Sequence, residues 1–211
     1  MRKRAATEYR PLANLKVVRQ STQSIGLHSS SSQVCLSVMA DDLFRLRVTP
    51  QRKFSANPSW AVHQTNWPSV ATTVQVSSKA IALRTASATF RVSSNDGAWS
   101  LISPAGETMF EAAPGAVGFA GKEARVKLRL AENESLFGLG ETTGTFNKRG
   151  LIREFWNTDI LGHVPAIHPS QRSLYVSIPF AVSLRDGRAA GIFWDNPGRQ
   201  IWDLGQTQLD R

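Results

Sequence analysis

Hydrophobic and polar residues alternate over several short stretches of the chain, and this period of two is typical of a β-strand with one buried face. The alternation predicts strands around residues 34–38, 44–48, 74–76, 81–83 and 126–130. In each stretch an aliphatic or aromatic residue recurs at every second position, which places these side chains on one face of a sheet. We therefore expect a chain built mainly from β-strands.

Two pairs of strands are predicted to form hairpins. One spans residues 90–101 and turns at Asn95-Asp96-Gly97, and the other spans residues 180–194 and turns at Asp186-Gly187. An Asp-Gly pair supplies the positive φ values that a tight hairpin turn needs. Strand signals thus recur about every ten residues, with turn residues between them, which is typical of a β-sandwich. We find no amphipathic helix of ordinary length, so the predicted fold class is all-β, a β-sandwich.

The formal charge of +9 is concentrated near the N-terminus. Residues 1–20 contain six Lys or Arg residues and one Glu, a net charge of +5, which leaves +4 for the other 191 residues. A nucleic-acid interface needs basic side chains gathered on one face or helix, whereas here they are dispersed among strands. We therefore predict a basic N-terminal arm over residues 1–20, a β-sandwich domain over residues 21–211, and no nucleic-acid partner.

Membrane and secretion signals are not found in the sequence. No apolar run approaches the roughly 18 residues of a membrane helix, and Met1-Arg2-Lys3-Arg4 is not followed by the apolar segment of a signal peptide. The single Cys35 has no partner for an internal disulfide. We expect a cytoplasmic protein with no membrane partner.

Motifs for metal and cofactor chemistry are weak. His163 and His168 are five residues apart, with prolines nearby, which is not the spacing of two ligands on one helix face. The glycines of 137–144 lack the residues that complete a nucleotide-binding loop. No G-x-S-x-G nucleophile motif occurs. We expect no metal and no cofactor.

Carboxylates between residues 136 and 205 are the remaining candidates for chemistry. Glu141 has Lys148 and Arg149 as possible ion-pair partners, and Asp195 precedes a turn sequence. Asp159 follows Trp156-Asn157-Thr158 at the start of a loop interrupted by prolines, where a polar group beside an aromatic ring suits a sugar contact. The candidates are Glu141, Asp159, Asp195 and Asp203.

Five short motifs follow one another in this region. They are Phe-Gly-Leu-Gly-Glu (137–141), Asn-Lys-Arg-Gly (147–150), Trp-Asn-Thr-Asp (156–159), Leu-Tyr-x-Ser-Ile-Pro-Phe (174–180) and Gly-Ile-Phe-x-Asp-Asn (191–196). Taken in this order, they resemble the N-terminal β-sandwich domain of glycoside hydrolase family 31, the α-glucosidase and α-xylosidase family. The resemblance is specific over roughly residues 130–205, and the upstream strands match only in rhythm.

The resemblance implies a fold like galactose mutarotase, a supersandwich, and a position before a (β/α)₈ barrel that performs retaining hydrolysis. The barrel's nucleophile motif does not occur here, so the resemblance implies that this chain alone is inactive. It also implies that Asp159 lies on a loop that reaches into the barrel's active site and binds a sugar hydroxyl. The predicted substrate-binding residues are Asp159 and Asn157, the predicted substrate is an α-glycoside, and no catalytic residue is assigned.

Two alternatives remain open at this point. One is a self-standing carbohydrate-binding module, and the other is a mutarotase-like epimerase that uses His163 or His168 with Glu141 as acid and base. A domain that packs on a barrel should expose an apolar or aromatic patch. The expected members of that patch are Phe146, Phe155 and Trp156.

Overall fold

The computed structural model describes residues 8–51, 53–54, 59–160, 162 and 173–207. Seventeen β-strands and no helix are found in this part of the chain, which confirms the predicted all-β class. Within the same residues no helix has the length and apolar character needed to cross a membrane. The chain divides into two compact units, the first of residues 1–58 and 64–129 and the second of residues 59–63 and 130–211.

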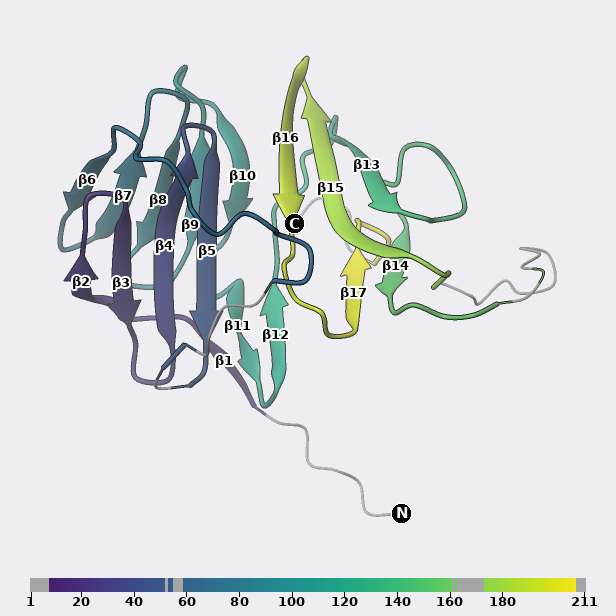
Figure 1. Ribbon diagram of the computed structural model, residues 1–211, viewed down its shortest axis with the longest axis horizontal. Helices are drawn as coiled ribbons and strands as arrows, with labels where there is room; N and C mark the ends of the chain where they lie inside the picture. The colour runs from purple at the N-terminus through teal and green to yellow at the C-terminus, as the bar shows by residue number, and fades with distance from the viewer. Residues whose placement is uncertain (1–7, 52, 55–58, 161, 163–172, 208–211) are drawn as a thin grey trace. The chain divides into compact units, whose positions relative to one another are not determined.

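The first unit contains three antiparallel sheets. Their strand orders are β2-β3-β4-β5, β10-β9-β8-β7-β6 and β1-β11-β12 (Figure 1). The strands are β1 (Tyr9–Pro11), β2 (Lys16–Gln20), β3 (Ser24–His28), β4 (Gln33–Ala40), β5 (Leu43–Thr49), β6 (Thr73–Val76), β7 (Ala80–Arg84), β8 (Thr89–Ser93), β9 (Trp99–Ile102), β10 (Thr108–Ala112), β11 (Val117–Ala120) and β12 (Glu123–Val126).

The four-stranded and five-stranded sheets of the first unit lie face to face and form a sandwich (Figure 1). Leu27 of β3 is paired with Val34 of β4, and both side chains are buried, as alternation requires. The facing sheet contributes Ile81, which is fully buried. Phe44 of β5 packs against Phe90 of β8 with ring centroids 6.0 Å apart. These contacts between the two sheets form the hydrophobic core of the sandwich.

The structure differs from the predicted arm over residues 1–20. Within that range Tyr9–Pro11 pairs with β11 and Lys16–Gln20 pairs with β3, so this part of the chain is built into two sheets; residues 1–7 lie outside the described residues. Strand pairing uses backbone groups, and an outer strand tolerates charged side chains that point to solvent. The basic composition of residues 1–20 therefore did not indicate that Tyr9–Pro11 and Lys16–Gln20 form paired strands.

The strands predicted from alternation and from the two hairpin turns are found, with one difference in extent. The stretch 126–130 was expected to be a strand, but β12 ends at Val126. Beyond it the backbone N–H of Lys127 donates to Ala116 and that of Arg129 donates to Glu111. The chain thus keeps an extended path with isolated hydrogen bonds, which produces the same alternation without a regular ladder.

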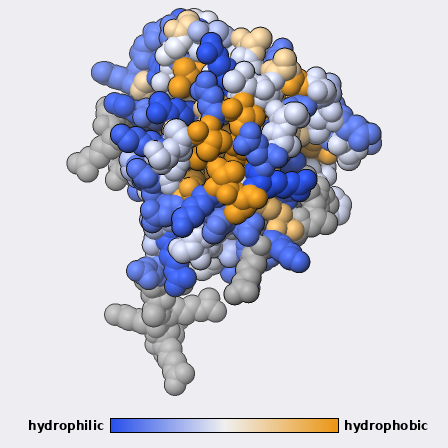
Figure 2. Space-filling view, turned by 90° about the vertical axis from the view of Figure 1, so that its left-hand side faces the viewer, coloured by the Kyte–Doolittle hydropathy of each residue, from blue (hydrophilic) through white to orange (hydrophobic). Residues whose placement is uncertain are grey.

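Hydrophobic side chains gather in a strip on the side of the first unit that faces the viewer in Figure 2. β2 and β6 are outer strands of their sheets, and they carry the exposed residues Val17, Val18 and Val76. An outer strand lacks a neighbour on one side, so its apolar side chains are only partly covered. We interpret the strip as the open edge of the sandwich.

The second unit contains a three-stranded sheet, β13-β15-β16, and a two-stranded sheet, β14-β17, both antiparallel. Its core consists of Leu136, Leu139, Phe155, Ala181 and Leu204. The strands are β13 (Ser135–Gly140), β14 (Ile152–Phe155), β15 (Ser177–Arg185), β16 (Arg188–Phe193) and β17 (Gln200–Asp203).

The Gly-Leu-Gly sequence of β13 forms a bulge. The register with β15 shifts between Gly138 and Gly140, and the three residues have φ values of 96°, 71° and 68°. A Cβ atom on Gly138 would lie 2.8 Å from the carbonyl oxygen of Phe180, and one on Gly140 would lie 2.8 Å from the Ile178 side chain. Glycine is required at both positions by backbone conformation and by close approach. The bulge buries Leu139 in the core and ends β13 immediately before Glu141.

Candidate functional site

The loop that carries Asp159 begins where β14 ends. The side-chain oxygen of Asn157 accepts a hydrogen bond from the backbone N–H of Ser177 at 2.9 Å. The backbone N–H of Thr158 donates to the carbonyl oxygen of Leu174 at 2.9 Å. The Thr158 hydroxyl turns back to the carbonyl oxygen of Trp156 at 2.8 Å. Residues 156–158 are therefore fastened to the segment that leads into β15.

The residue that follows β13, Glu141, also contacts the segment that leads into β15. We call the segments 156–160, 174–177 and Glu141 the Asp159 cluster. The Glu141 carboxylate accepts a hydrogen bond from the backbone N–H of Val176 at 3.1 Å, and the Tyr175 hydroxyl donates to the carbonyl oxygen of Ile160. The sequence suggested that Glu141 pairs with Lys148 or Arg149, and this was wrong. Glu141 and Tyr175 each link segments that are distant in the chain, and no local sequence signal reveals such a contact.

Asp159 lies on the surface within this cluster. Its side chain is exposed, and among the described residues we find no hydrogen bond or ion pair to its carboxylate. The neighbouring polar side chains of Asn157 and Thr158 are both engaged with the backbone. An exposed carboxylate on a fastened loop can accept hydrogen bonds from ligand hydroxyl groups without first losing an internal partner.

Asn157 has a mixed role in this geometry. Its oxygen is committed to Ser177, so only the amide nitrogen, which carries two N–H donors, remains to meet a ligand. Asn157 is exposed to solvent. Asn157 is therefore first a support for the loop, and its use as a sugar contact stays a prediction.

The other candidate carboxylates have structural roles. Asp195 accepts a hydrogen bond from the Ser59 hydroxyl at 2.8 Å. Asp203 accepts from the backbone N–H of Gln206 at 2.7 Å and from the Thr207 hydroxyl. Partial burial alone would raise the pKa of Asp203, but the hydrogen bonds from Thr207, Gln206 and Gly205 together hold it below its usual value.

Histidine chemistry cannot be placed in this cluster. His163 and His168, which the epimerase alternative requires, lie outside the described residues. Among the residues that are described, no group of three or more His, Cys, Asp or Glu side chains could hold a metal ion. Glu141, the carboxylate that the epimerase alternative requires, uses one of its oxygens to accept a hydrogen bond from the backbone N–H of Val176.

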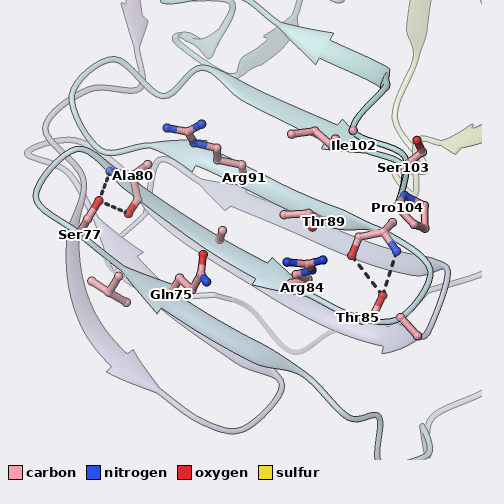
Figure 3. Close-up of a pocket in the computed structure, with 15 residues that line it drawn as sticks. Gln75, Ser77, Ala80, Arg84, Thr85, Thr89, Arg91, Ile102, Ser103 and Pro104 are labelled. Atoms are coloured by element: carbon pink, nitrogen blue, oxygen red, sulfur yellow. Dashed lines mark hydrogen bonds between the residues drawn. The ribbon is translucent and has the colours of Figure 1, made fainter.

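A hollow of about 460 Å³ lies over the outer face of β6, β7 and β8 in the first unit (Figure 3). Its floor includes Ala82 and Ala88, and Arg84 and Arg91 supply its charged groups. No aromatic ring and no carboxylate belongs to the described residues that line it. A sugar site usually offers an aromatic face, and an acid/base site needs a carboxylate or a histidine, so this hollow fits neither.

Of the three residues expected in an exposed aromatic patch, two are exposed and one is buried. Phe146 is 84% exposed and Trp156 is 53% exposed, whereas Phe155 is only 4% exposed and belongs to the core. Phe155 packs against Trp202 of β17 with ring centroids 5.1 Å apart. Phe155 is the last residue of β14 and lies on the buried face of that strand, whereas Trp156 follows the end of the strand.

Solved structures that share the fold of this chain include enzymes of glycoside hydrolase family 31. A family 31 dextranase from Flavobacterium johnsoniae superposes with a TM-score of 0.77 at 23% identity, over 97% of this chain and 24% of that one. A family 31 α-xylosidase from Xanthomonas citri gives a TM-score of 0.66 at 22% identity, over 86% of this chain and 19% of that one. At these identities the likeness establishes the fold, a mutarotase-like sandwich.

Two curated relatives match at higher identity over a shorter length. Alpha-glucosidase 2 from Bacillus thermoamyloliquefaciens is 39% identical over 82 residues, which are 38% of this chain and 10% of the relative. An alpha-glucosidase from Saccharolobus solfataricus is 31% identical over 91 residues, which are 43% of this chain and 13% of the relative. The matched region thus spans about a tenth of each relative's length.

The sequence profile described as the glycosyl hydrolase 31 N-terminal galactose mutarotase-like domain matches residues 33–203. This range includes most of the sandwich and all five motifs, and with them the bulge at Gly138 and the loop that carries Asp159. The chain therefore belongs to the family of N-terminal, galactose mutarotase-like domains of glycosyl hydrolase 31.

Proposed function

We propose that this chain serves as the non-catalytic N-terminal domain of a retaining α-glycosidase, that it packs on a catalytic (β/α)₈ barrel, and that it lends Asp159 to the barrel's sugar-binding site. Its membership of the glycosyl hydrolase 31 N-terminal family supports the first part. The matching relatives named alpha-glucosidase support an α-glycoside as the substrate.

The state of Asp159 is the observation that carries the proposal. Asp159 is exposed, whereas the residues around it are held by hydrogen bonds to Ser177 and Leu174. A carboxylate that served only to stabilise its own loop would accept hydrogen bonds from nearby backbone N–H groups, as Asp203 does. Asp159 is thus presented outward on a fixed support, which suits a contact to a hydroxyl group of a sugar.

The exposed aromatic residues support the packing on a barrel. Phe146 rests on Phe137 with ring centroids 5.0 Å apart, yet most of its surface faces solvent. Trp156 directly precedes the loop that carries Asp159. Large exposed aromatic side chains are typical of surfaces that a partner covers.

Catalysis is assigned to the barrel because retaining hydrolysis needs two opposed carboxylates, about 5–5.5 Å apart. In the cluster around Asp159 the other carboxylate is Glu141, and it accepts a hydrogen bond from Val176. We expect the purified chain to show no hydrolysis of aryl α-glycosides. Turnover that persists through repeated purification would overturn the non-catalytic role.

The contribution of Asp159 is tested by kinetics of the intact enzyme. Asp159→Ala removes the acceptor, and a charge-assisted hydrogen bond to a hydroxyl contributes about 1.5–3 kcal/mol, so kcat/KM should fall about ten- to a hundredfold. Asp42→Ala, which removes an exposed aspartate of the β4–β5 turn, is the matched control and should leave kcat/KM unchanged. Equal kinetics for the two variants would refute the substrate role.

A further inference from the structure

The hollow over β6, β7 and β8 follows from the order of large and small side chains on the outer face of the five-stranded sheet. Phe90 of β8 is buried on the inner face, so its neighbours Thr89 and Arg91 point outward. Thr89 is opposite Arg84 of β7 (Figure 3). Arg91 is opposite Ala82 of the same strand. The two arginines therefore lie on one diagonal of the strand pair and two smaller side chains lie on the other, which leaves the hollow of about 460 Å³.

The charge of this hollow is positive. Arg84 and Arg91 both line it, and none of the described lining residues is a carboxylate. Diagonal neighbours on one face of an antiparallel pair lie about 7–8 Å apart, which is within reach of long side chains. We find no hydrogen bond or ion pair to either guanidinium group among the described residues. Both arginines are thus available to a single ligand in the hollow.

The carboxylates closest to the hollow along the sheet are used elsewhere. The registers of β8, β9 and β10 place Glu111 in line with Arg91, two strands away, which is about 10 Å. Glu111 is ion-paired with Arg129 at 3.6 Å. Glu107 accepts a hydrogen bond from the Ser103 hydroxyl at 3.4 Å. The positive charge of the hollow is therefore not balanced from these positions.

Uncharged polar side chains in the hollow divide into two kinds. Two of them belong to turns at its rim: the Ser77 hydroxyl donates within the β6–β7 turn at 2.9 Å, and the Thr85 hydroxyl donates within the β7–β8 turn at 3.2 Å. Gln75 and Thr89 lie on the strands, and we find no side-chain hydrogen bond from either among the described residues. The rim groups thus shape the hollow, whereas the strand groups remain to meet a ligand.

We propose that the hollow binds a small organic anion, with Arg84 and Arg91 holding an oxyanion group and with Gln75 and Thr89 meeting hydroxyl groups on the rest of the ligand. The fork of guanidinium N–H donors matches the oxygens of a phosphate, sulfate or carboxylate. A volume of about 460 Å³ lies within the range of about 300–1,000 Å³ of small-molecule sites, and it is much larger than a free phosphate ion. This site is independent of Asp159 and of the proposed glycosidase role.

Binding is tested by calorimetry on the chain itself, with glucose 6-phosphate, inorganic phosphate and glucose as probes at one ionic strength set with sodium chloride. Glucose and its 6-phosphate differ only in the oxyanion group, and inorganic phosphate lacks the organic part. We expect saturable binding of glucose 6-phosphate, weaker binding of phosphate and no measurable binding of glucose. Failure of glucose 6-phosphate to bind, or equal affinity for glucose, would overturn the proposal. Phosphate affinity equal to that of glucose 6-phosphate would contradict an organic ligand.

Substitutions of the arginines locate the site. Arg84→Met and Arg91→Met should each lower the affinity for glucose 6-phosphate at least about tenfold, because charge-assisted hydrogen bonds are lost. Arg10→Met is the matched control, since it removes an exposed arginine of β1, in a different sheet, and should leave the affinity unchanged. An equal loss in all three variants would mean that only the general positive charge of the chain attracts the anion, and would overturn the site.

A fourth variant fills the hollow without changing the charge. Ala82 lies between the two arginines on the floor, so Ala82→Leu places a larger side chain where the ligand should lie. We expect at least about a tenfold loss of affinity for glucose 6-phosphate. Melting temperatures without ligand show whether each variant is folded. Wild-type affinity in a folded Ala82→Leu chain would contradict binding in the hollow.

Discussion

The side-chain oxygen of Asn157 accepts a hydrogen bond from the backbone N–H of Ser177 at 2.9 Å, across 20 residues of sequence. This single contact joins the end of β14 to the start of β15 and so fixes the residue two positions before Asp159. The position of the Asp159 carboxylate therefore depends on Asn157, whose side-chain oxygen is already used in a hydrogen bond within the domain.

Two substitutions of Asn157 separate its supporting role from a ligand contact. Asn157→Asp keeps the acceptor for Ser177 and loses the amide donor, so the melting temperature should hold while kcat/KM of the intact enzyme falls about tenfold. Asn157→Ala loses both, and the free energy of unfolding should also fall by about 1 kcal/mol. If Asn157→Asp leaves kcat/KM unchanged, Asn157 is a support only.

The bulge in β13 should be sensitive to a single methyl group. Gly138→Ala introduces a Cβ 2.8 Å from the Phe180 carbonyl oxygen at a φ of +96°, and we expect the free energy of unfolding to fall by more than about 2 kcal/mol. Gly150→Ala is the control, because its φ is +78° but no atom lies within 4 Å of the new Cβ. It should cost only about 1 kcal/mol. Urea denaturation measures both; equal losses would show that close approach at Gly138 is unimportant.

The aromatic residues of the second unit should divide into core and surface. Phe155→Ala empties a core position and should lower the free energy of unfolding of the chain by about 3–5 kcal/mol. Phe146→Ala should leave the stability of the chain almost unchanged, since the ring is mostly exposed, but should weaken the packing of the domain in the intact enzyme. Urea denaturation of each variant, as the chain and as the intact enzyme, measures these effects. A larger loss of chain stability for Phe146→Ala than for Phe155→Ala would contradict the division into core and surface.

Stability should increase as the pH rises through the alkaline range. The pKa of Lys148 in the folded chain is lowered from 10.5, first by burial and then by Arg153. Between the folded and unfolded pKa values the unfolded chain binds more protons, so the free energy of unfolding rises with pH. Lys148→Met should remove this part of the rise. Urea denaturation from about pH 8 to pH 10.5 measures it, and identical slopes for the two proteins would contradict the assignment.

Much of the sandwich could be predicted from the sequence because alternation and Asp-Gly turns are local signals. Pairs such as Val34 and Val48 follow from the alternation within their two predicted strands. The strands at residues 9–20 were missed because their charges suggested an arm, although charge on an outer strand does not prevent backbone pairing.

The candidate site was only partly predictable. The motif that contains Asp159 indicates a loop, but the fastening of that loop depends on Glu141 with Val176 and on Tyr175 with Ile160. These contacts join residues 35 and 15 positions apart, so they are set by the path of the bulged strand rather than by neighbours in sequence. Likewise, no sequence signal indicated that Lys148 and Arg153 are buried in the structure.

Whether Asp159 accepts a hydrogen bond from a sugar hydroxyl can be measured with substrates that lack one hydroxyl each. In the intact enzyme, kcat/KM would be measured for wild type and Asp159→Ala on an aryl α-glycoside and on its monodeoxy analogues. Melting temperatures of both proteins serve as the control for folding. We expect that for one analogue the two proteins differ by less than about threefold, whereas for the parent substrate they differ by about tenfold or more, because the hydroxyl and its acceptor act as a pair. The same loss with the parent and every analogue, or a loss that only follows a lower melting temperature, would contradict the claim.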